Sequence, residues 1–214
     1  MDIASYIDHT ALKPEITPGD VERLCREAIE NRFAAVCVNP LYVTAAAGWL
    51  ARSKVGLATV VGFPLGASTT SIKAREAWEA LQQGATEIDM VMSVGLFKAG
   101  ELKSVERDVA EVVRVADDKL VKVILETGLL TRDEIMQACR LCADAGAAYV
   151  KTSTGFGPRG ASVDDVRAMK EAVGGRCKVK ASGGIRTREQ ALAMIEAGAL
   201  RIGTSAGVAI VKGA

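Results

Sequence analysis

The feature that most constrains the fold of this chain is a joint that recurs along it: an alanine-rich helical run, a glycine and then a short strand-like run. The joint appears as EALQQGATEIDM, CADAGAAYVK and MIEAGALRIG, where the glycines are Gly84, Gly146 and Gly198. A glycine in this place is typical of a helix C-terminus. Helices that alternate with strands in this way predict a parallel sheet, because parallel strands need crossover connections.

Eight short runs rich in β-branched and apolar residues predict eight strands. We expect them at Tyr6–Thr10, Ala34–Val38, Val55–Val61, Glu87–Met92, Leu120–Glu126, Ala148–Thr152, Cys177–Ala181 and Leu200–Thr204. Two of the intervening helices have the capping-box pattern at their start, in Thr131-Arg-Asp-Glu134 and Thr187-Arg-Glu-Gln190.

Eight such units in 214 residues, with no linker between them, predict an α/β fold. We expect a single (β/α)8 TIM barrel domain that spans residues 1–214, near the lower size limit of that architecture. A doubly wound open sheet is the alternative. It needs a glycine-rich turn after the first strand, and the sequence there is His-Thr-Ala-Leu-Lys-Pro.

The charge balance excludes several classes of partner. The formal net charge is +1, whereas a nucleic-acid or anionic-membrane surface needs an excess of basic residues, so we expect neither partner. No apolar run approaches the roughly 20 residues of a membrane span. The opening MDIASYIDHT lacks the basic stretch and apolar core of a secretory signal. We therefore expect a soluble, cytoplasmic protein.

Cysteine and histidine are placed poorly for metal or redox chemistry. Cys139 and Cys142 form a CxxC pair, but the surrounding EIMQACRLCADAG has helical periodicity and the sequence offers no second ligand pair. We interpret both cysteines as structural. His9 is the only histidine, which argues against most transition-metal sites and against Ser-His or Cys-His machinery. We interpret it as a strand-end group or a support for other site residues.

Charged residues recur on the predicted strands at positions that point inward. Successive side chains of a strand face opposite sides of a sheet, and barrel enzymes carry their catalytic groups at the C-terminal ends of the strands. The residues expected to face the interior are Asp8, Asp89, Lys122, Lys151 and Lys180. Such a cluster is costly unless its members compensate one another, and it is our candidate functional site.

Three of these assignments have alternatives. Lys151 either reaches solvent or acts in the site, and its place between AGAAYV and a Thr-Ser-Thr-Gly loop favours the site. Lys178 stands two residues before Lys180, and we place Lys180 in the site because it lies nearer the strand end. Asp89 either takes part in the chemistry or only neutralises Lys122.

Two buried lysines on neighbouring strands predict Schiff-base chemistry. An amine must be neutral to attack a carbonyl, whereas the pKa of a free lysine is about 10.4. Burial and a nearby cation both favour the neutral form. One of the two lysines would then be the nucleophile that takes up a small aldehyde, and the other would be the perturbing cation.

Glycine-rich turns follow the last two predicted strands. Ala181-Ser-Gly-Gly-Ile185 and Gly203-Thr-Ser-Ala-Gly207 both open into helices. Barrels bind phosphate at this place through backbone N–H groups. These turns predict a site for a phosphorylated substrate.

Motifs in order along nearly the whole chain resemble those of the deoxyribose-phosphate aldolases. They are Asp8-His-Thr-Ala-Leu-Lys-Pro14, Val36-Cys-Val-Asn-Pro40, Val61-Gly-Phe-Pro64, Glu87-Ile-Asp-Met-Val91, Val150-Lys-Thr-Ser-Thr-Gly155, Lys180-Ala-Ser-Gly-Gly-Ile185 and Gly203-Thr-Ser205. The resemblance implies that Lys151 forms the imine, that Lys180 perturbs it and that Asp89 relays protons through water. Further substrate contacts are expected at Asp8, Thr10, Cys37, Lys122, Thr152, Gly155, Gly183, Gly184, Gly203, Thr204 and Ser205.

The implied reaction is the reversible cleavage of 2-deoxy-D-ribose 5-phosphate to D-glyceraldehyde 3-phosphate and acetaldehyde. No metal or organic cofactor is required, and a homo-oligomer, either a dimer or a tetramer, is expected. Another phosphosugar barrel, such as a transaldolase-like enzyme or an isomerase, is the alternative enzyme. A barrel that only binds a phosphorylated sugar is the alternative without catalysis.

The chain departs from the resemblance at two places. Some members carry a lysine directly after KTSTG, where this chain has Phe156, so the corresponding phosphate contact is either lost or supplied by Arg159 or Arg186. Some members also carry a C-terminal tail that ends in tyrosine and assists proton exchange. This sequence ends at Val211-Lys-Gly-Ala214.

Overall fold

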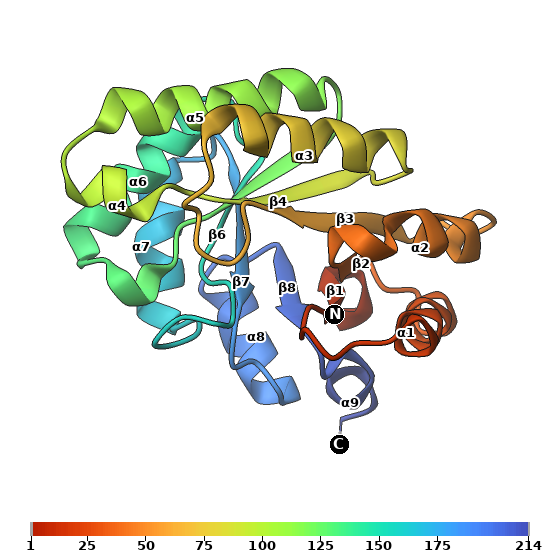
Figure 1. The fold of residues 1–214 in the computed structure, drawn as a ribbon. Helices are drawn as coiled ribbons and strands as arrows, with labels where there is room; N and C mark the ends of the chain where they lie inside the picture. The colour runs from red at the N-terminus through yellow and green to blue at the C-terminus, as the bar shows by residue number, and fades with distance from the viewer. Residues whose placement is uncertain (1, 214) are drawn as a thin grey trace.

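A computed structural model describes residues 2–213 and contains a closed barrel of eight parallel strands (Figure 1). Each strand pairs in parallel with the next, and β8 pairs with β1. The strands are β1 (Ile7–Ala11), β2 (Ala35–Val38), β3 (Gly56–Val61), β4 (Glu87–Val91), β5 (Leu120–Ile124), β6 (Tyr149–Lys151), β7 (Lys178–Ser182) and β8 (Arg201–Thr204). The predicted TIM barrel is confirmed.

Helices surround the barrel, with α3 beside α5 and α1 beside α2 (Figure 1). The α-helices are α1 (Pro18–Glu30), α2 (Val43–Leu50), α3 (Thr70–Gln82), α4 (Val94–Lys98), α5 (Leu102–Ala116), α6 (Arg132–Asp144), α7 (Val163–Val173), α8 (Arg188–Glu196) and α9 (Gly207–Lys212). Short 3-10 helices are η1 (Ile3–Tyr6), η2 (Pro40–Tyr42) and η3 (Thr127–Leu129). None of the helices within residues 2–213 has the length and hydropathy that a membrane crossing needs.

All eight predicted strands are present, with ends that differ from the prediction by two residues or fewer. The largest difference is at β5, which was expected to reach Glu126 and ends at Ile124. Glu126 has a φ of 55°, in the left-handed region, and its carboxylate accepts a hydrogen bond from the Thr154 backbone N–H. A residue in that conformation cannot continue a strand.

The local signals for helix ends are confirmed. Thr131 and Thr187 cap α6 and α8 through the predicted capping boxes. Gly84, Gly146 and Gly198 all have positive φ, between 90° and 116°, at the joints between helix and strand. The CxxC pair lies within α6 as free, buried thiols, in agreement with a structural role.

The apolar core lies mainly between the strands and the helices. Residues that alternate with the inward-facing charges, such as Ile88, Val123 and Val179, are fully buried in it. A separate small apolar cluster of Leu12, Cys37, Ala58 and Val60 packs with Phe63. The large apolar core is therefore mostly separate from the charged barrel interior.

A buried ion pair outside the barrel ties two helices to the end of β4. Lys73 of α3 donates to Asp108 of α5 at 2.5 Å, to the Val91 carbonyl at 3.0 Å and to the Ser93 hydroxyl at 2.9 Å. Both charged side chains are at most 2% exposed. The contact fixes the C-terminal end of the strand that carries Asp89.

The Lys73→Met variant should be strongly destabilised, because it leaves the Asp108 carboxylate buried without its cation. We expect a loss of about 3–5 kcal/mol in the free energy of unfolding, measured by urea denaturation. The control is Lys98→Met, which breaks the partly exposed pair with Glu134 and should change stability little. Equal losses in the two variants would contradict the structural role of Lys73.

Candidate active site

One carboxylate in the barrel interior binds three lysines. Asp89 of β4 accepts from Lys122 of β5 at 2.6 Å through Oδ1, and from Lys151 of β6 and Lys180 of β7 at 2.8 Å each through Oδ2. All four side chains are buried. They come from four consecutive strands, so the parallel register of the barrel brings them together.

A second group of charges lies below this one, toward the N-terminal ends of the strands. Asp8 of β1 contacts Lys180 at 2.5 Å through Oδ2 and Arg201 of β8 at 2.7 Å through Oδ1. Glu87 contacts Lys122 at 2.5 Å and receives both hydrogen bonds of one Arg201 nitrogen. We call these seven side chains, Asp8, Glu87, Asp89, Lys122, Lys151, Lys180 and Arg201, the interior network.

The interior network contains four basic and three acidic groups, so its charges balance when one lysine is neutral. Burial lowers the pKa of Lys151, Asp89 opposes this, and nearby Lys180 lowers it further, so the net shift is downward. Burial also disfavours the Lys180 cation, but Asp8 and Asp89 outweigh it and raise the pKa of Lys180 well above the usual range. The two lysines therefore differ in the direction expected for a nucleophile and its perturbing cation.

Asp89 and Lys122 both stay charged. Burial alone would raise the pKa of Asp89, but Lys122, Lys151 and Lys180 hold it well below its usual range. Burial disfavours the Lys122 cation, yet its pKa is raised, chiefly by Asp89. Burial raises the pKa of the nearby Cys37 thiol to about 11, which keeps that group protonated.

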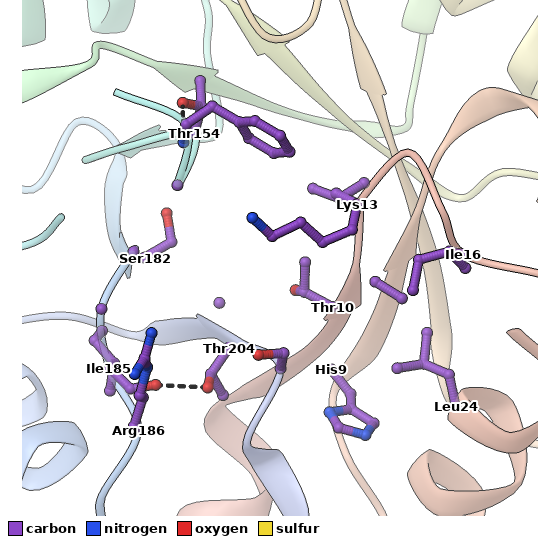
Figure 2. Close-up of a pocket in the computed structure, with 18 of the residues that line it drawn as sticks. His9, Thr10, Lys13, Ile16, Leu24, Thr154, Ser182, Ile185, Arg186 and Thr204 are labelled. Carbon is purple, nitrogen blue, oxygen red and sulfur yellow. Dashed lines mark hydrogen bonds between the residues drawn. The ribbon is translucent and has the colours of Figure 1, made fainter. Parts of the chain in front are cut away.

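A cavity of about 510 Å3 opens at the C-terminal ends of the strands. Of the interior network, Lys151 is the one member that lines it, and the other six side chains lie outside its lining. Figure 2 shows the cavity between Thr10 on β1, Thr154 after β6, Ser182 on β7 and Thr204 on β8. A ligand in this cavity therefore meets one amine of the network.

The turns after β7 and β8 form one wall of the cavity. Gly183 has a φ of 90°, and a Cβ there would lie 3.0 Å from the Gly160 Cα, so the close approach of the two loops needs glycine. The Thr204 hydroxyl donates to the Ile185 carbonyl at 2.7 Å, as the dashed line in Figure 2 marks. The two turns are thus held against each other.

Eight of the residues predicted to act in the site line the cavity. They are Thr10, Lys151, Gly155, Gly183, Gly184, Gly203, Thr204 and Ser205. The remaining predicted residues are buried around it and do not line it: Asp8, Cys37, Asp89, Lys122, Thr152 and Lys180. The hydroxyl of Thr152 donates to the Ser182 carbonyl at 2.9 Å and so joins the ends of β6 and β7.

Sequence reasoning missed Glu87 and Arg201 as members of the interior network. A usable signal exists, because Glu87 stands two residues before Asp89 and Arg201 two residues before Gly203. Residues two apart on a strand face the same side. Both residues begin their strands, where a charged side chain is easily interpreted as solvent-exposed.

The structure separates the two arginines proposed to replace a lysine at position 156. Arg159 donates to the Thr127 carbonyl at 3.1 Å and pairs with Asp165, outside the cavity lining. Arg186 lines the cavity (Figure 2). His9 faces α1, where its Nε2 lies 2.8 Å from a Glu27 carboxylate oxygen, so it supports the wall of the cavity.

Comparison with known proteins agrees with this geometry. Residues 3–213 match the model of the DeoC/LacD family of aldolases. A deoxyribose-phosphate aldolase of Brevibacillus brevis is 55% identical over 214 residues, which cover 100% of this chain and 97% of that protein. One of Thermococcus gammatolerans is 57% identical over 218 residues, with the same two coverages.

The backbone is also similar to that of a solved structure. The tetrameric deoxyribose phosphate aldolase of Aeropyrum pernix superposes with a TM-score of 0.92 at 36% identity, over 98% of this chain and 89% of that one. The fold, the full-length match and the identities to curated relatives point to the same group of proteins. This chain belongs to the DeoC/LacD family of aldolases.

Proposed function

We propose that this protein is a class I aldolase, a carbon–carbon lyase that reversibly cleaves 2-deoxy-D-ribose 5-phosphate to D-glyceraldehyde 3-phosphate and acetaldehyde. The observation that carries the proposal is the single amine that the interior network presents to the cavity, that of Lys151. The curated relatives that match the full chain are deoxyribose-phosphate aldolases, which supports the same substrate. The reaction belongs to deoxyribose phosphate catabolism.

The first step is imine formation on Lys151. Its neutral amine attacks C1 of the open-chain sugar, and loss of water gives an iminium ion. The lowered pKa of Lys151 supports this role, because a larger fraction of the amine is neutral near pH 7. Lys180 stays protonated 2.8 Å from the carboxylate that Lys151 also contacts, and its charge keeps the nucleophile from being protonated.

The second step breaks the C2–C3 bond. Removal of the proton from the C3 hydroxyl releases glyceraldehyde 3-phosphate, and the bonding electrons move to the iminium to form an enamine. We assign the proton relay to Asp89 through a water molecule, because its carboxylate touches Lys151 but does not line the cavity. Protonation of the enamine at C2 and hydrolysis of the new iminium release acetaldehyde and restore Lys151.

Phosphate recognition is proposed at the turns after β7 and β8. Gly183, Gly184 and Ser205 line the cavity on the same wall as Arg186. Backbone N–H groups in such turns bind phosphate oxygens, and a guanidinium adds a charged fork. Lys151 lines the same cavity, so a sugar whose phosphate is held at these turns would have its aldehyde end free to meet that amine.

The proposal extends to the cofactor requirement, the cellular location and the oligomeric state of the enzyme. The iminium serves as the electron sink, so we propose that neither a metal nor an organic cofactor takes part. We propose a cytoplasmic location, which agrees with five free cysteines, since thiols persist in reducing compartments. A homo-oligomer, either a dimer or a tetramer, is supported by the tetrameric relative from Aeropyrum pernix.

The purified protein should release acetaldehyde from 2-deoxy-D-ribose 5-phosphate, and pretreatment with EDTA should leave the rate unchanged. Acetaldehyde is measured by NADH oxidation with added alcohol dehydrogenase, after gel filtration has removed the chelator. The control is Lys151→Met, which should release none. Loss of activity on chelation with recovery on adding zinc would overturn the Schiff-base class.

Borohydride should trap the imine on Lys151. Incubation with acetaldehyde and sodium borohydride reduces the iminium and leaves an ethyl group on the reacting nitrogen, which peptide mass mapping locates. The Lys151→Met variant should take up no ethyl group within the barrel. An adduct on Lys180 in the unaltered protein would reverse the two assignments.

Replacing Lys180 by Met should shift the activity to higher pH. The change deletes the cation that lowers the pKa of Lys151 and leaves Asp89 to raise it. Each unit of rise removes about tenfold of the neutral amine near pH 7, or ~1.4 kcal/mol. The pH dependence of kcat/KM reports this, because it follows ionisations of the free enzyme.

The matched control is Lys180→Arg, which keeps the positive charge at that position. Its pH profile should stay near that of the unaltered protein even where its rate is lower. Lys151→Met should be inactive at every pH. A Lys180→Met enzyme with an unshifted profile would make Lys180 a bystander.

A further inference from the structure

Two cations in the cavity are not committed to a carboxylate. The basic residues in its lining are Lys13, Arg23, Lys151 and Arg186. Arg23 pairs with Asp20 at 2.6 Å, and Lys151 is held by Asp89. Within residues 2–213, neither Lys13 nor Arg186 takes part in a salt bridge. Both are thus available to an anionic ligand, and they reach the cavity from opposite sides (Figure 2).

Lys13 is aimed into the cavity by the loop between β1 and α1. Its ammonium group extends toward the open space between Thr154 and Ser182 (Figure 2). The loop is fixed on both sides of Lys13, because the Leu12 carbonyl accepts from Asn39 at 3.3 Å and the Lys13 carbonyl accepts from the Ile16 N–H at 3.2 Å. The backbone that carries the cation is therefore preorganised.

The ring of Phe156 contacts this cation. The Lys13 ammonium lies 5.0 Å from the centre of the Phe156 ring, in a cation–π contact. The ring itself packs edge to face against Phe63, with centres 5.4 Å apart and an angle of 89°. Phe63 packs in turn on the small apolar cluster that contains Leu12. The aromatic pair thus limits where the lysine side chain can lie.

We propose that Lys13, held in a cation–π contact with Phe156, is a specificity-determining residue that binds the phosphate of the sugar substrate. The inference rests on the proposed function. A compact ammonium group on a preorganised loop suits a phosphate oxygen, and Lys13 shares the cavity with the turns at Gly183–Gly184 and Ser205. Position 156 then supplies a ring that holds a cation from the loop after β1, and Phe156 is a positioning residue.

The test compares two sugars in three single variants and one double variant. Lys13→Met removes the cation and keeps an unbranched stem. Phe156→Leu removes the ring and keeps an apolar side chain. Lys178→Met is the matched control, because Lys178 lies 5.6 Å from the Tyr149 ring in a similar cation–π contact, but at the start of β7 and outside the cavity lining.

Lys13→Met should lower kcat/KM for 2-deoxy-D-ribose 5-phosphate about tenfold, the effect of losing one charge-assisted contact. Its kcat/KM for unphosphorylated 2-deoxy-D-ribose should be unchanged. Phe156→Leu should shift the same selectivity by a smaller factor, and the double variant should match Lys13→Met, because the ring acts through the lysine. Lys178→Met should change neither sugar.

Two outcomes would overturn the proposal. Equal losses on both sugars would show that Lys13 supports the loop and does not read the phosphate. An unchanged kcat/KM for both sugars in Lys13→Met would show that the phosphate lies elsewhere.

Binding of inorganic phosphate separates this inference from the proposed function. Calorimetry with phosphate needs no turnover, and the Kd should rise about tenfold in Lys13→Met and stay constant in Lys178→Met. If the unaltered protein releases no acetaldehyde, the proposed function fails, and the phosphate titration still decides the role of Lys13. An unchanged Kd in Lys13→Met would contradict the inference.

Discussion

The rest of the site depends on the contacts between the Asp89 carboxylate and three lysines. Its two oxygens accept from Lys122, Lys151 and Lys180, each from a different strand. A lone buried carboxylate would be protonated, because burial disfavours the charged form. Three surrounding cations keep Asp89 ionised, and Asp89 in turn holds Lys151 and Lys180 near each other against their mutual repulsion. The closed barrel fixes the spacing of the strands, and so keeps these charged side chains within contact distance of one another.

Ion pairs at both ends of the interior network offset the free-energy cost of burying its charges. Arg201 closes the lower end of the interior network by contacting Asp8 and Glu87, which fixes the partners of Lys180 and Lys122. At the upper end Lys151 contacts one carboxylate and then meets the cavity. The surplus positive charge is therefore most easily lost at Lys151, by release of its proton. The position of the amine that we propose as the nucleophile follows from where the network ends.

The sequence was sufficient for the fold and for five of the inward-facing charges, because both follow from local periodicity. The β-branched and apolar runs gave the positions of all eight strands to within two residues, and the joints at Gly84, Gly146 and Gly198 marked the starts of three of them. The end of β5 was misjudged because the left-handed turn at Glu126 depends on a contact with Thr154, 28 residues away. Such a contact leaves no local pattern. Catalytic roles came from the family resemblance and remain predictions for the experiments.

The cations around the cavity mouth escape motif reasoning for a physical reason. In a barrel the C-terminal ends of all strands converge on one opening, so a side chain from the loop after β1 reaches the same space as one from the loop after β6. The charge at a given point in the cavity is thus not tied to one place in the sequence. Phe156 in KTSTGF is read from the motif as a lost cation, whereas Lys13 lies over its ring. A comparison of aligned positions detects that position 156 lacks a lysine. It does not detect that Lys13 places a cation there, because the two residues are neighbours only in the folded chain.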